Sequence, residues 1–135
     1  MLCMRKCIFL KSTVVLIGLF FLAPAQAHYL WLEKVDGQPR IYFGEYQDGL
    51  HEKSGGRLDT IAQPQAQALL TGKNPVDVAV ERKNDHLALI KAPAKARLIA
   101  WDFGLKVKDL SKNKIGIVKP MYYARLAVGD VEDVS

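Results

Sequence analysis

Short apolar runs separated by turn residues make up most of the chain after residue 27, and this pattern constrains the fold more than any other feature. In the first run, Tyr29 and Trp31 alternate with Leu30 and Leu32 before the turn signal Asp36-Gly37. Further runs of this kind lie at 40–46, 76–82, 86–92, 97–103 and 115–128. Six or seven short strands in such a chain predict an all-β domain, an immunoglobulin-like Greek-key β-sandwich.

The segments between these runs carry fewer signals. Residues 48–56 and 104–114 are polar or charged and are expected to form loops, whereas residues 58–71 are rich in Ala, Gln and Leu. That composition predicts one or two helical turns after Pro64, ended by Gly72 as a C-cap. Gly44, inside the second run, marks a bulge or a close approach of backbone.

The first 27 residues have the organisation of a secretory signal. Three basic residues precede the apolar stretch 12–22, which is followed by the small-residue gate Ala25-Gln26-Ala27. This stretch is shorter than the roughly 20 residues that a transmembrane helix needs. We therefore expect a signal peptide at 1–27 that is cleaved after Ala27; an uncleaved anchor is the alternative. The remaining residues, 28–135, would form one domain.

Cleavage changes the chemistry that is available. It removes Cys3 and Cys7, neither of which lies in a lipobox, and leaves 108 of the 135 residues without a thiol or a disulfide. An exported chain without cysteine fits the bacterial periplasm. Its 16 basic and 14 acidic residues give a charge of about +2. The two signs are interleaved along the sequence, so charge gives no argument for nucleic-acid binding.

No catalytic motif was found in the sequence. It contains no G-x-S-x-G elbow, no phosphate-binding glycine loop and no H-E-x-x-H helix. We therefore expect a protein that is not an enzyme. The larger aromatic residues are interpreted as core residues in preference to a carbohydrate-stacking platform. They are Trp31, Tyr42, Phe43 and Trp101.

His28 would become the amino terminus of the mature chain. Its α-amine and Nδ1 can then close a chelate ring on one metal ion, because both groups deprotonate near neutral pH. Two nitrogen donors, joined by a third donor, suit Cu(II) or Ni(II). The alternative is that histidine merely follows the cleavage gate, since signal peptidase tolerates many residues there.

Four further residues are candidate ligands, and each has a simpler interpretation. Glu45 ends a strand and is otherwise an exposed carboxylate; His51 lies in a polar loop that is otherwise only solvated. His86 follows an Asn-Asp turn, where a hydrogen bond to the turn is the simpler role. Met121, before two tyrosines, is more often a packing residue than a soft ligand.

Three stretches in this order resemble a family of exported bacterial domains described as periplasmic components of nickel/cobalt uptake systems. They are A-H-Y-L-W-L-E at 27–33, R-I-Y-F-G-E at 40–45 and M-Y-Y-A-R-L-A-V-G at 121–129. The resemblance implies a β-sandwich, a periplasmic location and the binding or delivery of a divalent transition metal, with a membrane permease as partner. By position it points to His28 first and to Glu45 second.

The chain departs from this family in two ways. Met121 stands where the family often has a histidine before Y-Y-A, so one ligand is lost or replaced by a thioether. The sequence also stops soon after that strand, whereas many relatives continue, which predicts a shortened or minimal member.

These observations leave three interpretations of function. The first is a non-catalytic periplasmic protein that binds or delivers nickel, cobalt or copper. The second is an immunoglobulin-like binding or structural module of the cell envelope that needs no metal. A copper oxidase built on an amino-terminal histidine is the third, and it lacks a clearly placed second histidine.

Overall fold

The computed structural model describes residues 27–127, and this part of the chain is mostly β-strand. The strands are β1 (Tyr29–Val35), β2 (Gln38–Glu45), β3 (Leu50–His51), β4 (Gln65–Leu69), β5 (Val76–Asp77), β6 (Ala79–Arg82), β7 (Leu87–Ile90), β8 (Arg97–Asp102), β9 (Lys108–Asp109), β10 (Ile117–Val118) and β11 (Tyr122–Ala127). Single 3₁₀ turns occur at η1 (Tyr46–Asp48), η2 (Arg57–Thr60) and η3 (Ser111–Asn113). The predicted all-β class is confirmed.

The expected signal peptide, apart from Ala27, and the polar tail 129–135 lie outside the described residues. Within residues 27–127, no helix is long and apolar enough to cross a membrane.

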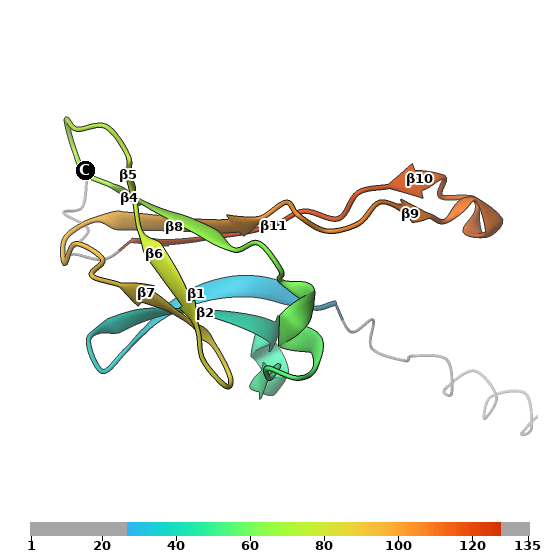
Figure 1. The fold of residues 1–135 in the computed structure, drawn as a ribbon, viewed down its shortest axis with the longest axis horizontal. Helices are drawn as coiled ribbons and strands as arrows, with labels where there is room; N and C mark the ends of the chain where they lie inside the picture. Colours follow the sequence, from blue (N-terminus) through green and yellow to red (C-terminus); the bar gives the residue numbers. More distant parts are fainter. Residues whose placement is uncertain (1–26, 128–135) are drawn as a thin grey trace, which may run out of the picture.

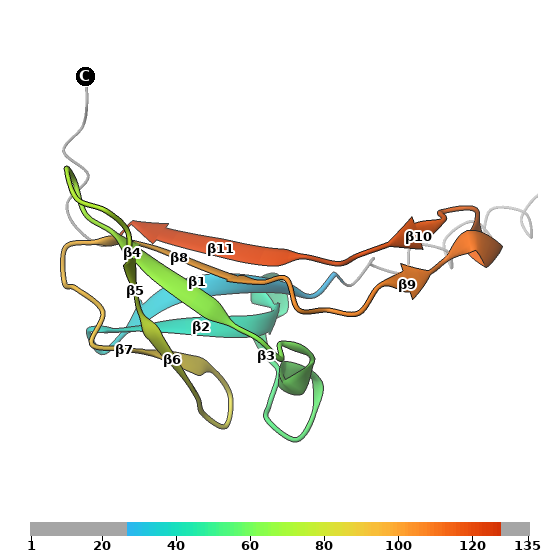
Figure 2. The same cartoon turned by 45° about the horizontal axis from the view of Figure 1, so that its top comes forward.

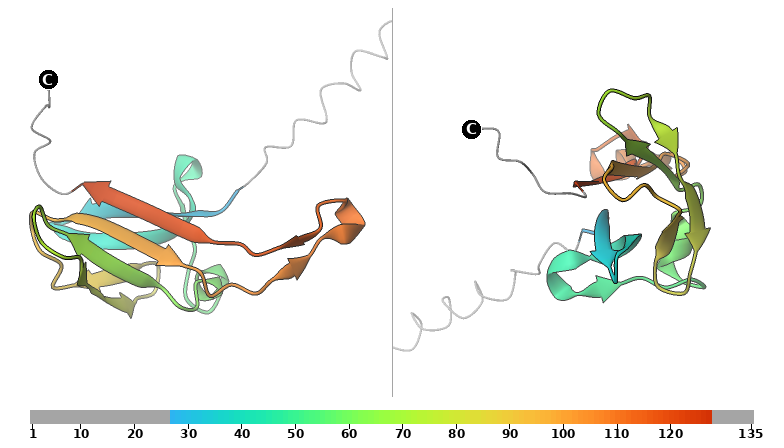
Figure 3. Two further views of the ribbon diagram at one scale, coloured as in Figure 1. Left: turned by 90° about the horizontal axis from the view of Figure 1, so that it is seen from above. Right: turned by 90° about the vertical axis from the view of Figure 1, so that its left-hand side faces the viewer.

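The strands form two antiparallel sheets that pack face to face (Figures 1 and 3). The first sheet has the order β1-β2-β7-β6, and β3 pairs with the end of β2. The second sheet has the order β11-β8-β4-β5. A separate small hairpin of β9 and β10 extends away from both sheets (Figure 2).

Alternation along the strands fills the space between the sheets. In β1, Leu30 and Leu32 are buried while Tyr29 and Trp31 face outward, so the predicted alternation is confirmed but the expected core position of Trp31 is wrong. The first sheet contributes large aliphatic and aromatic residues to the core, and the second contributes several alanines. The core includes Ile41, Phe43, Leu87 and Leu89 from the first sheet and Ala66, Ala68, Leu98, Ala100 and Ala124 from the second.

The Asp36-Gly37 turn fixes how β1 and β2 pair. Both residues have positive φ, 50° and 77°, which is the type I′ geometry that suits a two-residue hairpin. The turn places Val35 opposite Gln38 and, at the far end of the hairpin, Tyr29 opposite Gly44. The predicted turn is confirmed.

The predicted helical turns after Pro64 are wrong. Residues 65–69 form β4, with Ala66 and Ala68 buried against β8. Their alternation with glutamines suits a strand, and pairing with β8 outweighs the helical propensity of Ala, Gln and Leu. Gly72 has a φ of 69° in a turn after β4, so it caps no helix.

The predicted continuous strand at 76–82 is interrupted at Val78. Its first part, β5, pairs with β4 in the second sheet, and its second part, β6, pairs with β7 in the first. The alternation of valines at 76, 78 and 80 predicts that all three face inward. Val78 is buried at the crossing, as this predicts, but Val76 is 48% exposed. β6 and β7 form the hairpin that the Asn84-Asp85 turn signal between the two runs predicts.

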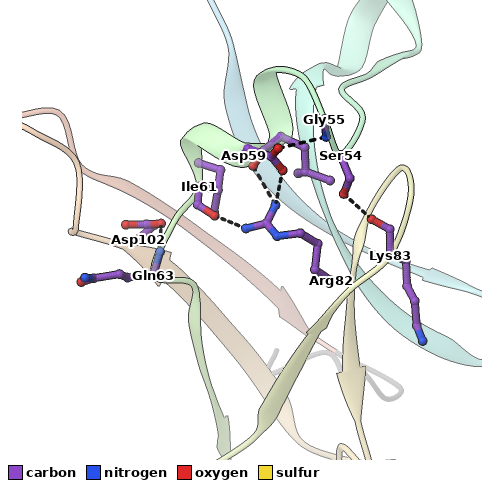
Figure 4. A network of polar contacts seen from close by, with 9 residues as sticks. Ser54, Gly55, Asp59, Ile61, Gln63, Arg82, Lys83 and Asp102 are labelled. Atoms are coloured by element: carbon purple, nitrogen blue, oxygen red, sulfur yellow. Dashed lines mark hydrogen bonds and ion pairs between the residues drawn. The ribbon is translucent and has the colours of Figure 1, made fainter.

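Two buried or partly buried polar side chains hold the loop between β3 and β4 (Figure 4). Arg82 donates to the carbonyl oxygens of Leu58, at 2.9 Å, and Ile61. The carboxylate of Asp102, fully buried, accepts from the backbone N–H of Gln63 at 2.8 Å. Because these groups come from both sheets, the loop keeps a defined position across them.

Gly44 gives a test of the backbone geometry. Its φ is 147°, and an added Cβ would lie 2.0 Å from the carbonyl oxygen of Leu50. We expect Gly44→Ala to lower the free energy of unfolding by about 3 kcal/mol, measured by urea denaturation. Gly37→Ala is the control, because it has a positive φ but open space around it, and it should cost only about 1 kcal/mol. Equal losses would contradict the close approach at Gly44.

Candidate metal site

His28 and Glu45 lie opposite each other at the open end of the first hairpin. Continuing the β1–β2 register by one residue beyond Tyr29 and Gly44 pairs these two positions. His28 faces inward and is mostly buried, with its ring 5.5 Å from that of Phe43. Phe43 in turn packs against Tyr122 of β11 at 5.3 Å. The imidazole therefore covers one end of the core.

Glu45 occupies an inward position that a core residue would normally fill. It follows Ile41 and Phe43 on the same face of β2 and is only 6% exposed. Its Oε1 lies 3.4 Å from Nδ1 of His28 and has no hydrogen-bond partner among the described residues. A buried carboxylate oxygen without a hydrogen bond is costly, and a protonated His28 ring would be its ion-pair partner.

Glu52 holds the other side of the imidazole. The backbone N–H of Glu52 donates to the carbonyl oxygen of Phe43 at 2.8 Å, which continues the pairing of β3 with β2. Its Oε1 is then 2.5 Å from Nε2 of His28. Glu52 was not among the predicted ligands, because its position depends on a two-residue strand inside a polar loop. That loop carries no periodic signal.

The contacts of His28 favour one tautomer. A distance of 2.5 Å between Nε2 and the Glu52 carboxylate requires a proton between them, so Nε2–H donates. Arg57 Nη1 is also 3.2 Å from Nε2; as a donor it would favour an unprotonated Nε2, but the contact with Glu52 is shorter and is given more weight. In the neutral imidazole, the lone pair of Nδ1 then faces the carboxylate of Glu45. In a protonated imidazole, Nδ1 and Oε1 would instead form an ion pair at 3.4 Å.

The other two histidines lie on the outer face of the first sheet. The His51 ring is 4.1 Å from that of Tyr42, and the His86 ring is 5.7 Å from it. Nδ1 of His86 is 2.7 Å from Asp85 Oδ1, which agrees with the predicted hydrogen bond to the turn. The structure therefore separates His51 and His86 from His28 by the thickness of the sheet.

Met121 lies at the surface. It precedes β11 and is 62% exposed, whereas its neighbour Tyr122 packs inward. Within residues 27–127, no three His, Cys, Asp or Glu side chains are arranged to hold a metal ion. Of the five candidate ligands, the structure brings together only His28 and Glu45.

The aromatic residues divide between core and surface. Tyr42 and Phe43 are buried, as expected. Trp31 is only partly buried on the outer face, where it stacks on Tyr42 with ring centroids 5.5 Å apart. Trp101 is likewise partly exposed, on the outer face of the second sheet.

Comparisons with known proteins gave no match to a family model, to a curated protein or to a solved structure. The resemblance to exported nickel/cobalt uptake components therefore stays a prediction.

The Asp85–His86 contact allows a test by titration. The hydrogen bond with His86 is the main cause that lowers the pKa of Asp85 below its ordinary value of 3.8. We expect His86→Ala to raise the pKa of Asp85 toward 3.8, measured by NMR of the side-chain carboxyl carbon. Since this pKa is lowered on folding, the contact stabilises the fold above pH 3.8, and that contribution fades as the pH falls through the lowered pKa.

His51→Ala is the matched control, because His51 acts on Asp85 only as a more distant charge. It should raise the pKa of Asp85 less than His86→Ala does. If the pKa of Asp85 were unchanged in His86→Ala, the hydrogen bond with His86 would not be the cause of the lowered pKa.

Proposed function

We propose that this protein is a periplasmic, non-catalytic protein that binds or delivers a divalent transition metal through an amino-terminal histidine. The observation that supports this most is the buried Oε1 of Glu45, which has no hydrogen-bond partner in the described part of the chain and faces Nδ1 of His28. A cation between these atoms would satisfy both of them. Export and cleavage after Ala27 are part of the proposal, since they create the α-amine.

The spacing of the donor atoms fits a metal ion. Two donors each about 2.1 Å from one ion lie about 3.0 Å apart in a square arrangement and about 3.4 Å apart in a tetrahedral one. Nδ1 and Oε1 are 3.4 Å apart. The α-amine of His28 would be the third donor, and it exists only after cleavage. The proposed site needs this backbone donor, because side chains alone form no three-ligand group within residues 27–127.

Glu52 would act as a positioning residue. A histidine that ligates a metal commonly donates its other ring N–H to a carboxylate, which fixes the tautomer and makes the ligand more basic. The contact between Nε2 and Glu52 supports this arrangement. The donor set of two nitrogens and one carboxylate oxygen suits nickel, cobalt or copper more than magnesium or calcium. The metal would be cargo, passed to a membrane permease.

We further propose that the fold is of the immunoglobulin-like Greek-key type. In that fold, strands A, B, E and D form one sheet and C, F and G the other. Reading β1, β2, β7 and β6 as A, B, E and D gives the observed order of the first sheet. Reading β11, β8 and β4 as G, F and C gives that of the second, with β5 as an added edge strand. These orders support the assignment.

A metal-free binding module of the cell envelope is the second candidate. Its support is a group of aromatic residues on the outer face of the first sheet. Trp31 contacts the rings of both Tyr29 and Tyr46, and these two tyrosines are exposed. Exposed aromatic residues of this kind are frequent in binding sites.

The metal hypothesis is tested with mature protein that begins at His28. We expect it to bind Ni(II) or Cu(II) in isothermal titration at pH 7.5. One additional N-terminal alanine should weaken binding at least about 100-fold, because it removes the chelate. Glu45→Gln should weaken binding by about 10- to 100-fold, since it removes a negatively charged donor.

Glu33→Gln, on the outer face of the same hairpin, is the matched control and should bind like the parent protein. Urea denaturation of each variant would show that it is folded. Equal and weak binding by the parent and the extended protein would exclude the chelate and favour the metal-free module. If Glu45→Gln behaves like Glu33→Gln, Glu45 is not a ligand.

A further inference from the structure

The hairpin around β9 and β10 projects beyond the two sheets as a narrow arm (Figures 1 and 2). We call residues 104–119 the lysine arm. Its own backbone contacts shape it: Ile117 pairs with Asp109 and Val118 with Lys108, and the N–H of Leu110 donates to the carbonyl oxygen of Gly116 at 2.8 Å. The arm is therefore a hairpin with its own turn, and the loop predicted at 104–114 is in part β9 and η3.

Positive charge is concentrated in the lysine arm. It contains five lysines and one acidic residue: Lys106, Lys108, Lys112, Lys114, Lys119 and Asp109. The other residues of the expected mature chain contain 11 basic and 13 acidic residues. The arm thus carries about +4, and the remainder about −2. The predicted interleaving of charges does not hold for this segment.

All five lysines of the arm are exposed. No ion pair in the described part of the chain includes any of them. Asp109, the one acidic residue of the arm, accepts a hydrogen bond from the N–H of Ser111 at 2.9 Å, so it serves the turn. The charge is available to an external partner.

Apolar side chains are exposed beside the lysines. Val107 is 60% exposed, Ile115 62% and Ile117 73%. On the returning strand, Ile117, Lys119, Met121 and Tyr123 are all exposed, while the residues between them are partly buried. This alternation sets aliphatic, thioether and aromatic groups beside a lysine on one side of the chain. Solvation alone accounts for lysines but not for such apolar exposure.

We propose that the lysine arm binds to a membrane surface rich in anionic phospholipid. Lysines are attracted to anionic headgroups, while short apolar side chains between them enter the interface. Residues 104–119 contain no arginine and no aromatic residue, the groups that read or stack on nucleic-acid bases.

Membrane binding by the lysine arm does not depend on the metal site, but it would determine on which side of the protein the membrane lies relative to that site. The arm leaves the sheets at the end where β1 begins (Figures 1 and 3). A protein held by the arm would therefore present the His28 end toward the membrane.

Vesicle flotation tests the proposal with mature protein that begins at His28, without added metal. We expect binding to vesicles of 30% phosphatidylglycerol in phosphatidylcholine, little binding to phosphatidylcholine alone, and weaker binding as salt rises. Lys108→Gln/Lys112→Gln/Lys114→Gln should weaken binding at least about tenfold, since each lysine near such a surface is worth up to about fivefold. Lys34→Gln/Lys73→Gln/Lys95→Gln is the matched control, with the same change of charge on exposed body residues, and should bind almost as the parent does.

Ile117→Trp provides a second readout that reports contact with lipid and not charge alone. Its added tryptophan emission should shift to shorter wavelength with anionic vesicles and should be quenched by brominated lipid. Equal losses in the two lysine triples would show a general charge effect and overturn the proposal. It would also be overturned if the protein bound polyglutamate but not the vesicles, which would indicate an acidic protein partner instead.

Discussion

The register of the first hairpin is the constraint on which the rest of the structure depends. The type I′ turn at Asp36-Gly37 fixes it, because both residues take positive φ. A shift of one residue would turn Leu30 and Leu32 outward and bring Tyr29 and Trp31 into the core. The same register sets His28 opposite Glu45 at the far end of the hairpin. The core and the candidate site are thus two consequences of one local geometry.

Packing of a loop against this hairpin completes the site. Gly44 allows the backbone of Leu50 to come so close that no side chain would fit, and β3 then brings Glu52 to His28. Arg82 and Asp102, from different sheets, hold the loop that follows. The carboxylate of Glu52, which orients the His28 imidazole, is therefore positioned by residues far apart from it in the sequence. This explains how a polar loop can contribute a defined contact to the end of the core.

Acidic and basic groups are separated at one end of the molecule, the acidic ones buried beside His28 and the basic ones exposed on the lysine arm. At the start of β1, two carboxylates surround an imidazole that is mostly shielded from solvent. The lysine arm, which leaves the sheets at that end, carries exposed cations and apolar groups. Buried acidic groups suit a small cation, because a metal ion can enter where a large partner cannot. Exposed cations on an arm suit an extended anionic surface.

Most strands could be predicted from the sequence, because alternation and turn residues are local properties: β1, β2, β7 and β8 lie within one or two residues of the expected ranges. The register that the turn sets also implies that His28 lies opposite Glu45. Local patterns could not determine that 65–69 is a strand, since only pairing with β8 outweighs helical propensity there. Nor could they separate His51 and His86 from His28 or bring Glu52 to it. Those positions depend on which face of a sheet a side chain occupies and on contacts between distant segments, which only the tertiary structure decides.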